Sequence, residues 1–534
     1  NRENGRGESH SPWSIWHDWP IEIPKPWSDG FSFLMNGIWS CTFSKAPVES
    51  PFSTVNFHSY QFALFFAVVY AAYLSLPHRW QNRLLLAASY AFYSFWDPRF
   101  LGLILLSTAT DFFCGRSMVA HPKGSAARRR FLLLSLGVNL SVLFFFKYFN
   151  FFLDNLNGLA GLFGLGLHLP TWRIILPVGI SFYTFQSLSY TIDVYRGQME
   201  PVDRFDDYAL YVAFFPQLVA GPIERATRLL PQIGAPRTLP PGYLGEGAFL
   251  IFWGLFKKIF IADNLAALLA YVGDPAGAGN RAGGMVLATT YAFMFQLYAD
   301  FSAYSDIARG TARLMGFDIM VNFRSPLFAP NIQETWNRWH ISLTSWIRDY
   351  LYFPLALSKW GRVRLDVRVV VILTFLIMGL WHGAAWGFVL WGGFNGLLLA
   401  GYGTISPALR RWKKRIDAPE PVQRLGFGAS VLVTFHCMVL GALLFRGESL
   451  GQIGEWLRLL FTDFGWSPWT THILLRSFAY AAPLLAVDLI LYRHEDATRL
   501  FRFPRPVRYA FLYFALFLMV LFHAPASNFI YFQF

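Results

Sequence analysis

The sequence predicts an all-α protein that crosses a membrane many times. Of its 534 residues, 54% are hydrophobic and only 14% are charged, against roughly 25% charged in an average soluble domain. Hydrophobic runs recur from Tyr60 onward without a long polar linker, so one membrane domain is expected over residues 52–534. Residues 1–51 form an N-terminal extension to which the sequence assigns no role. The net charge of +13 then reflects basic cytoplasmic loops, and no nucleic-acid partner is expected.

The first four expected spans set the orientation of the chain. They cover residues 60–76, a stretch that ends at Trp96, residues 100–114 and residues 131–149. Short cytoplasmic loops are enriched in lysine and arginine. The arginine-rich loop 115–130 is therefore expected in the cytoplasm and the N-terminus outside. Lys147 lies near the outer end of the fourth span, where a long basic side chain can snorkel to the membrane surface.

The later spans bring the expected total to eleven or twelve transmembrane or re-entrant helices. Residues 214–222 are apolar but contain two prolines, which favours a short re-entrant or interfacial segment over a straight span. The other expected spans cover about 174–192, 248–261, 286–298, 369–380, 385–402, 430–445, 473–492 and 509–522.

Residues 334–350 predict an interfacial amphipathic helix that carries His340. Its apolar residues recur at spacings of three and four and include Trp336, Trp339, Leu343 and Trp346. His340 shares this apolar face. It is either a functional group or a core histidine bonded to a backbone carbonyl, and periodicity alone does not choose between the two.

His382 is the stronger candidate for function. Basic residues flank the apolar stretch 369–402 on both sides, so both of its ends are expected in the cytoplasm. A stretch of this length between two cytoplasmic ends must turn back at or within the bilayer, and residues 381–383 lie at the natural break. An ionisable group at bilayer depth is costly and usually belongs to a site. The alternative is a buried histidine that only links helices.

Buried histidines suit acyl transfer by general-base catalysis, because a neutral imidazole can take a proton from an attacking hydroxyl. No Gly-x-Ser-x-Gly motif lies near either histidine, which argues against a hydrolase triad. Asp300 or Asp306 could complete a three-ligand metal site, but His-x-x-x-His spacing is absent, so no metal is expected. Asp300, Ser302 and Asp306 lie at the end of an expected span, where they either orient a histidine or cap a helix.

Long ordered motifs carry a resemblance to a known family. The sequence resembles the membrane-bound O-acyltransferase family, specifically its bacterial alginate O-acetylation branch, at residues 300–306, 322–326, 339–352 and 379–383, with a supporting match in the terminal motif 529–534. Position 303 is Ala where Gly is usual in the family. The resemblance implies a ring of tilted helices around a thin centre, with the histidines on a central tunnel. It also implies that His382 is the catalytic histidine and His340 the second required one. Further tunnel or supporting candidates, all within the stretch 300–395, are Asp300, Ser302, Asp306, Asn322, Arg338, Trp339, Arg348, Asp349, Trp381 and Asn395.

The same resemblance implies how such a protein works. Members pass an acyl group, usually acetyl, from a cytoplasmic donor across the bacterial inner membrane to hydroxyls of a cell-surface polysaccharide. The expected donor is acetyl-CoA, no bound cofactor is expected, and the expected partner is a periplasmic esterase-like (SGNH) acetyltransferase. The resemblance does not choose among alginate, cellulose, peptidoglycan and other acceptors. The main alternative is a transporter of polysaccharide or lipid-linked sugar, and a third is a non-catalytic scaffold of a synthase complex.

Overall fold

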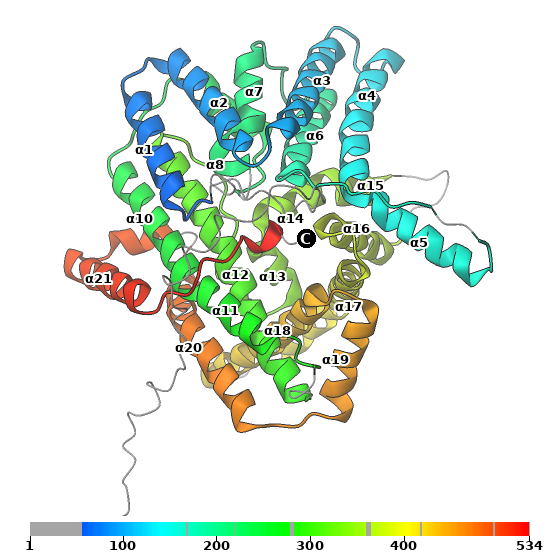
Figure 1. Ribbon diagram of the computed structural model, residues 1–534, viewed down its shortest axis with the longest axis vertical. Helices are drawn as coiled ribbons and strands as arrows, with labels where there is room; N and C mark the ends of the chain where they lie inside the picture. The colour runs from blue at the N-terminus through cyan, green and yellow to red at the C-terminus, as the bar shows by residue number, and fades with distance from the viewer. Residues whose placement is uncertain are drawn as a thin grey trace, which may run out of the picture. The chain divides into compact units, whose positions relative to one another are not determined.

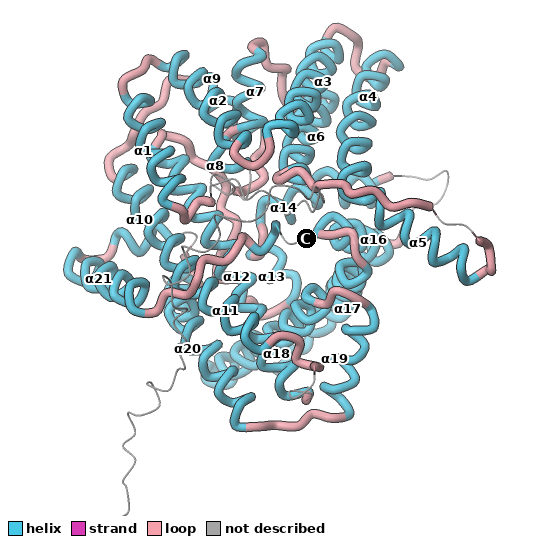
Figure 2. The backbone as a smooth tube through the Cα atoms, in the orientation of Figure 1, coloured by secondary structure: helices cyan, strands magenta, loops and turns pink. Residues whose placement is uncertain are grey.

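The computed structural model describes residues 56–166, 169–218, 221–277, 282–358, 365–416, 419–494 and 497–532. Within these ranges all regular secondary structure is helical, as Figure 2 shows. The all-α fold predicted from the sequence is therefore confirmed. The expected extension over residues 1–51 lies outside the described residues.

The helices are labelled in Figure 1 and follow one another along the chain. Their bounds are α1 (Tyr60–Leu74), α2 (His78–Ser94), α3 (Leu101–Val119), α4 (Ala126–Leu143), α5 (Phe149–Leu162), α6 (Ile180–Arg196), α7 (Phe205–Ala213), α8 (Phe215–Leu218), α9 (Ala226–Gly234), α10 (Tyr243–Phe256), α11 (Asp263–Val272), α12 (Gly283–Leu314), α13 (Ile332–Arg338), α14 (Ile341–Ile347), α15 (Phe353–Leu357), α16 (Val367–His382), α17 (Trp386–Ile416), α18 (Glu420–Arg446), α19 (Leu450–Thr462), α20 (Pro468–Leu491) and α21 (Arg505–Leu521). Three π-helical turns join neighbouring helices: η3 (Phe144–Tyr148), η4 (Lys257–Ala262) and η6 (Arg348–Tyr352).

Several helices have the length and composition of membrane spans. Among the described residues, four helical stretches are long and apolar enough to cross a membrane: α4 with α5, α17, α18 and α20. Helices α1 and α16 are apolar but shorter. The described residues of 214–222 contain the buried four-residue helix α8, in agreement with the expectation of a short broken segment and not of a straight span. The short helices α5, α7, α9 and α19 were not among the expected spans.

Helix α12 has carboxylates in the interior that pair with two buried lysines of η4. Lys258, on η4, is fully buried, and its Nζ lies 2.9 Å from Asp300 Oδ1 and 3.0 Å from Asp263 Oδ1. The neighbouring Lys257 Nζ lies 2.7 Å from Asp306 Oδ2 and donates to Ser302 Oγ at 2.9 Å. A buried charge is tolerated when it is paired in this way. These contacts tie η4 and α11 to the middle of α12.

The same charge cluster fixes the segment that follows α21. Lys258 Nζ donates to the Ser527 carbonyl at 2.9 Å, and the Ile530 amide donates to Asp300 Oδ2 at 2.7 Å. Ser527 Oγ donates to Asp263 Oδ1 at 2.6 Å. Figure 1 shows this segment, in red, running from α21 back toward the region of α14 and α16. It brings Tyr531 into contact with the ring of His382.

Helices α16 and α17 pack side by side as a tight hairpin (Figure 1). A Cβ on Gly379 would collide with the carbonyl oxygen of Phe388, and one on Gly392 with that of Phe375. Small residues let two membrane helices approach closely. The turn between them falls at residues 383–385. The expected hairpin, with His382 at its break, is therefore present.

We predict that Lys258→Met prevents stable folding, because it leaves the buried carboxylates of Asp263 and Asp300 without a counter-charge. Removing one partner of a buried pair typically costs about 3–5 kcal/mol. Detergent-solubilised protein should lose its monodisperse peak in size-exclusion chromatography at a temperature where wild type keeps it. Lys413→Met, at an exposed position of α17, is the control. Equal thermal stability of the two variants would contradict the role given to the cluster.

Candidate active site

His382 is the last residue of α16 and is enclosed by aromatic rings. Its side chain is 5% exposed. Ring centroids of Trp381 and Trp391 lie 5.0 Å from that of the imidazole, and that of Phe445 lies 5.4 Å away. Its buried Nδ1 has no hydrogen-bond partner. Buried polar atoms are rarely left unpaired, and each exception calls for an explanation. A ligand bound beside His382 would supply one.

His340 lies at a break between two helices, so the single helix expected over residues 334–350 is wrong. Helix α13 ends at Arg338 and α14 begins at Ile341. His340 itself has φ 44° and ψ 53°, in the left-handed region that a residue other than glycine rarely occupies. The segment is also buried, with His340 only 1% exposed. Periodicity could not reveal the break, because the apolar residues on both sides keep the helical spacing.

The loop before α13 holds this break in place through Asn322. The Asn322 carbonyl accepts from the Ile341 amide at 2.9 Å, and its side-chain Oδ1 accepts from Ser342 Oγ at 2.6 Å. Its Nδ2 donates to Ser305 Oγ on α12 at 3.0 Å. Asn322 is 1% exposed. The candidate Asn322 therefore serves the site indirectly, by fixing the main chain that carries His340.

The structure brings the two histidines close together. The Trp381 ring is near both of them, with its centroid 5.0 Å from that of His382 and 6.4 Å from that of His340. On another side, Phe301 is 4.5 Å from both His340 and Tyr531. Neither ring nitrogen of His340 has a hydrogen-bond partner. This geometry does not favour the alternative of a core histidine held by the backbone carbonyl of another residue.

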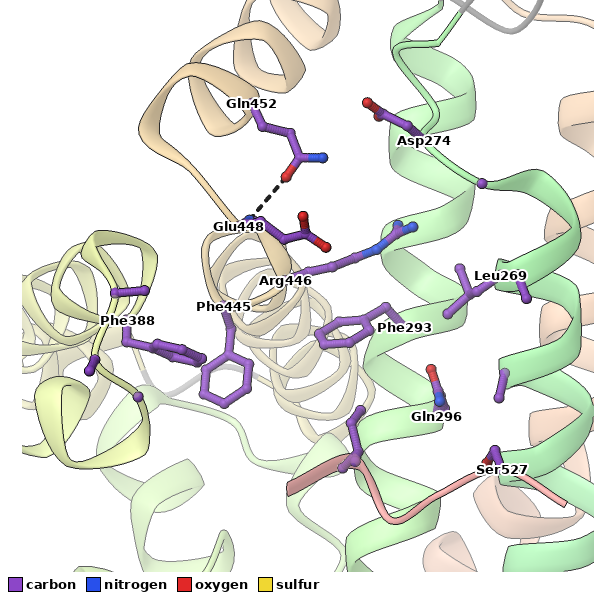
Figure 3. Close-up of a pocket in the computed structure, with 18 of the residues that line it drawn as sticks. Leu269, Asp274, Phe293, Gln296, Phe388, Phe445, Arg446, Glu448, Gln452 and Ser527 are labelled. Atoms are coloured by element: carbon purple, nitrogen blue, oxygen red, sulfur yellow. Dashed lines mark hydrogen bonds between the residues drawn. The ribbon is translucent and has the colours of Figure 1, made fainter. Parts of the chain in front are cut away.

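A large cavity opens beside the turn that follows His382. Its volume is about 1400 Å³, and Gly383, Ala384 and Ala385 form part of its wall. Figure 3 shows Phe388 and Phe445 on one side and Leu269 and Ser527 on the other, with Gln296 and Arg446 between them. Two smaller cavities border His382 itself. One of about 100 Å³ is shared with Lys147 and Tyr531, and one of about 40 Å³ with Trp339 and Asn395.

Lys147 reaches the site, so the expectation that it snorkels to the membrane surface is wrong. Its Nζ donates to the Trp381 carbonyl at 2.5 Å and to the His382 carbonyl at 3.1 Å. It also donates to Ser181 Oγ at 3.3 Å. The sequence showed a lysine near a helix end, but not that a π-helical turn follows α4 there.

The acidic candidates on α12 do not orient a histidine. Asp300 and Asp306 pair with Lys258 and Lys257, and Ser302 accepts from Lys257. The alternative of helix caps is also wrong, because all three residues lie inside α12 and not at its end. Asp300 acts at a distance, because it holds the segment that carries Tyr531. Among the described residues, no group of three or more His, Cys, Asp or Glu side chains could hold a metal ion.

The remaining candidates lie in three places. Trp381, Trp339 and Asn395 lie around the histidines, where Asn395 Nδ2 donates to the Trp391 carbonyl at 2.9 Å. Arg338 lies elsewhere and pairs with Glu334 at 2.7 Å. Arg348 and Asp349 are also outside the histidine site.

Asp349 belongs to a second large cavity. Its carboxylate pairs with Arg225 at 3.1 Å and with Arg348 at 2.9 Å. Asp349, Arg225 and Arg196 line a cavity of about 780 Å³. The sequence motifs included Asp349 among the site candidates, but they did not identify its partner Arg225. They also did not identify four neighbours of His382, namely Lys147, Trp391, Phe445 and Tyr531. Tyr531 lies in a terminal motif of the resemblance, which was the one available signal for it.

Comparison with known proteins places this site in a family. The family model for membrane-bound O-acyltransferases matches residues 191–439, which include both histidines. A protein of Azotobacter vinelandii named probable alginate O-acetylase AlgI is 39% identical over 435 residues, which cover 80% of this chain and 82% of that protein. This chain belongs to the membrane-bound O-acyltransferase family.

Other relatives of this O-acyltransferase are named for different acceptors. The peptidoglycan O-acetyltransferase of Helicobacter pylori is 34% identical over 413 residues, covering 72% of this chain and 74% of that protein. The teichoic acid D-alanyltransferase of Bacillus subtilis is 28% identical over 293 residues, covering 53% and 71%. The chain is thus a multi-pass membrane O-acyltransferase, which decides against the transporter alternative.

We predict that His340→Asn folds normally but loses acyl transfer. Asparagine tolerates the left-handed conformation of this position better than most residues, whereas alanine would add backbone strain. Purified His340→Asn should keep the size-exclusion profile of wild type, while transfer falls by about 10²-fold or more, as for the loss of an acid–base group. Normal transfer by a well-folded His340→Asn would show that this imidazole is not part of the chemistry.

Proposed function

We propose that this O-acyltransferase passes an acetyl group from cytoplasmic acetyl-CoA across the bacterial inner membrane to hydroxyls of a surface polysaccharide. The observation that carries the proposal is the imidazole of His382, which lies at a helix break beside two cavities and whose buried Nδ1 has no hydrogen-bond partner. The names of the relatives support a polysaccharide acceptor and leave its identity open. A periplasmic esterase-like protein is the proposed partner that delivers the group to the polymer.

The position of helix α4 supports a path for the acyl group between opposite sides of the membrane. Arg128, near its start, donates to the Val194 carbonyl at 2.7 Å, close to the 780 Å³ cavity that Arg196 lines. Lys147, just past its end, lines the 1400 Å³ cavity. Arg128 and Lys147 are nineteen positions apart, and a helix of that length rises by about 28 Å. This rise is near the thickness of a bilayer core, about 30 Å. The loop 115–130 is expected in the cytoplasm, so the smaller cavity is the proposed donor side.

The chemistry assigned to His382 is general-base catalysis. Its neutral imidazole takes the proton of an acceptor hydroxyl while the hydroxyl oxygen attacks the carbonyl carbon of the thioester. The tetrahedral intermediate then collapses, the carbon–sulfur bond breaks, and the imidazolium returns the proton to the leaving thiolate. The enclosing rings of Trp381, Trp391 and Phe445 exclude water, which would otherwise compete with the acceptor hydroxyl.

We predict that His382→Ala abolishes polymer acetylation in cells but leaves donor binding by the purified protein intact. Loss of a general base costs about 10²–10⁴ in rate, and more if the residue also positions the substrates. Acetate released from the isolated polymer by mild base measures the effect, in cells without a second acetyltransferase. His523→Ala, at an exposed position, is the matched control. Near wild-type acetylation by the His382→Ala cells would rule out this mechanism.

We also predict that the two ends of α4 lie on opposite sides of the membrane. In a variant with its native cysteines replaced, Ser125→Cys should react with a membrane-impermeant maleimide only after the cells are permeabilised. Ala384→Cys, in the wall of the larger cavity, should react in intact cells. The three arginines at positions 128–130, in the first turns of α4, give this expectation. Labelling of position 125 alone in intact cells would reverse the proposed direction of transfer.

A further inference from the structure

We infer that Lys147 is a positioning residue, whose ammonium group holds the helix end that carries His382. The inference rests on the proposed role of His382. It concerns a side chain that the proposed chemistry does not itself use. Lys147 lies in η3, the π-helical turn between α4 and α5. π-helical turns inside longer helices occur frequently at functional sites.

The contacts of Lys147 account for its whole hydrogen-bonding capacity. A lysine ammonium has three donors, and Nζ lies within hydrogen-bonding distance of three oxygens: the carbonyls of Trp381 and His382, and Ser181 Oγ. No donor is left over for a substrate. This distribution favours a group that organises the site over one that binds the acyl donor or the acceptor.

The two carbonyls that Lys147 binds are the final two of α16. The last carbonyls of a helix have no partner within the helix, and a cation there is stabilising. In the described part of the chain, no carboxylate lies within ion-pair distance of Lys147, unlike Lys257 and Lys258. An interior cation bonded only to neutral oxygens is costly. Its two shortest hydrogen bonds are to the carbonyl oxygens of Trp381 and His382, which indicates that the charge stabilises this end of α16.

His382 depends on this main-chain support, because no side chain holds its ring by a hydrogen bond to Nδ1. Catalytic histidines are commonly oriented by such a partner. Here the orientation comes from the surrounding rings and from the backbone of residues 381–382, which Lys147 fixes. The Trp381 ring also lies 5.6 Å from Nζ, so the ammonium holds both the ring and the carbonyl of that residue.

The first test compares transfer rates of purified, reconstituted variants. Lys147→Met should lower kcat by about 10²-fold, since a misplacement of roughly 1 Å can cost that much, while KM for acetyl-CoA stays the same. Lys147→Arg should recover most of the rate, because a guanidinium can also bind both carbonyls. Ser181→Ala removes only the third contact and should stay within about twofold of wild type. Wild-type kcat in Lys147→Met, or equal losses in Ser181→Ala and Lys147→Met, would overturn the inference. If Lys147→Met does not fold, Lys147→Gln replaces it, with the same loss expected and the same contrary result.

A second readout does not depend on catalysis. On the cysteine-free background, Ala384→Cys lies two residues beyond His382. Its rate of maleimide labelling should rise when Lys147→Met is added, because the turn is no longer held. An unchanged labelling rate would contradict the inference. If His382→Ala were to retain transfer, the proposed function would fail, whereas faster labelling would still show that Lys147 holds the turn.

Discussion

The pairing of Lys258 with Asp263 and Asp300 is the interaction on which the rest of the interior depends. A fully buried ammonium can be kept in an apolar protein only if carboxylates lie against it. These two carboxylates belong to α11 and α12, and both also bind the segment that follows α21. One charge cluster therefore fixes three parts of the chain that lie far apart in the sequence. The cluster thereby also holds Tyr531 in its place in the wall of the histidine site.

The histidine site shows the opposite arrangement, because its polar groups have no oppositely charged partners within the described part of the protein. His340 and the Nδ1 of His382 have no hydrogen-bond partners, and Lys147 binds neutral carbonyls. Groups in the scaffold are paired with one another, whereas groups in the site are left for a substrate or for positioning. Stability is thus provided by α12 and its lysines, while the α16–α17 turn carries the reactive imidazole. The close glycine contacts of that hairpin keep the turn in one place.

The sequence predicted the features that depend on composition and on long apolar runs. The all-α fold, the α16–α17 hairpin with His382 at its break, and the broken segment around α8 all follow from hydrophobicity and proline positions. Main-chain breaks within an apolar pattern could not be predicted, because the residues around His340 keep helical spacing through the break. Partners could not be predicted either. The sequence left open whether Asp300 and Asp306 orient a histidine or cap a helix, and the structure shows instead that Lys258 and Lys257 pair with them.

The central claim is that one imidazole, held at a helix break, serves acyl transfer between the two sides of a membrane. The most direct test uses proteoliposomes with labelled acetyl-CoA on one side, and a soluble sugar acceptor together with the periplasmic esterase-like partner on the other. Donor supplied on the face of loop 115–130 should yield acetylated sugar inside, and His382→Asn should reduce this product to the level of empty liposomes. Undiminished transfer by His382→Asn, in correctly oriented and folded protein, would contradict the account.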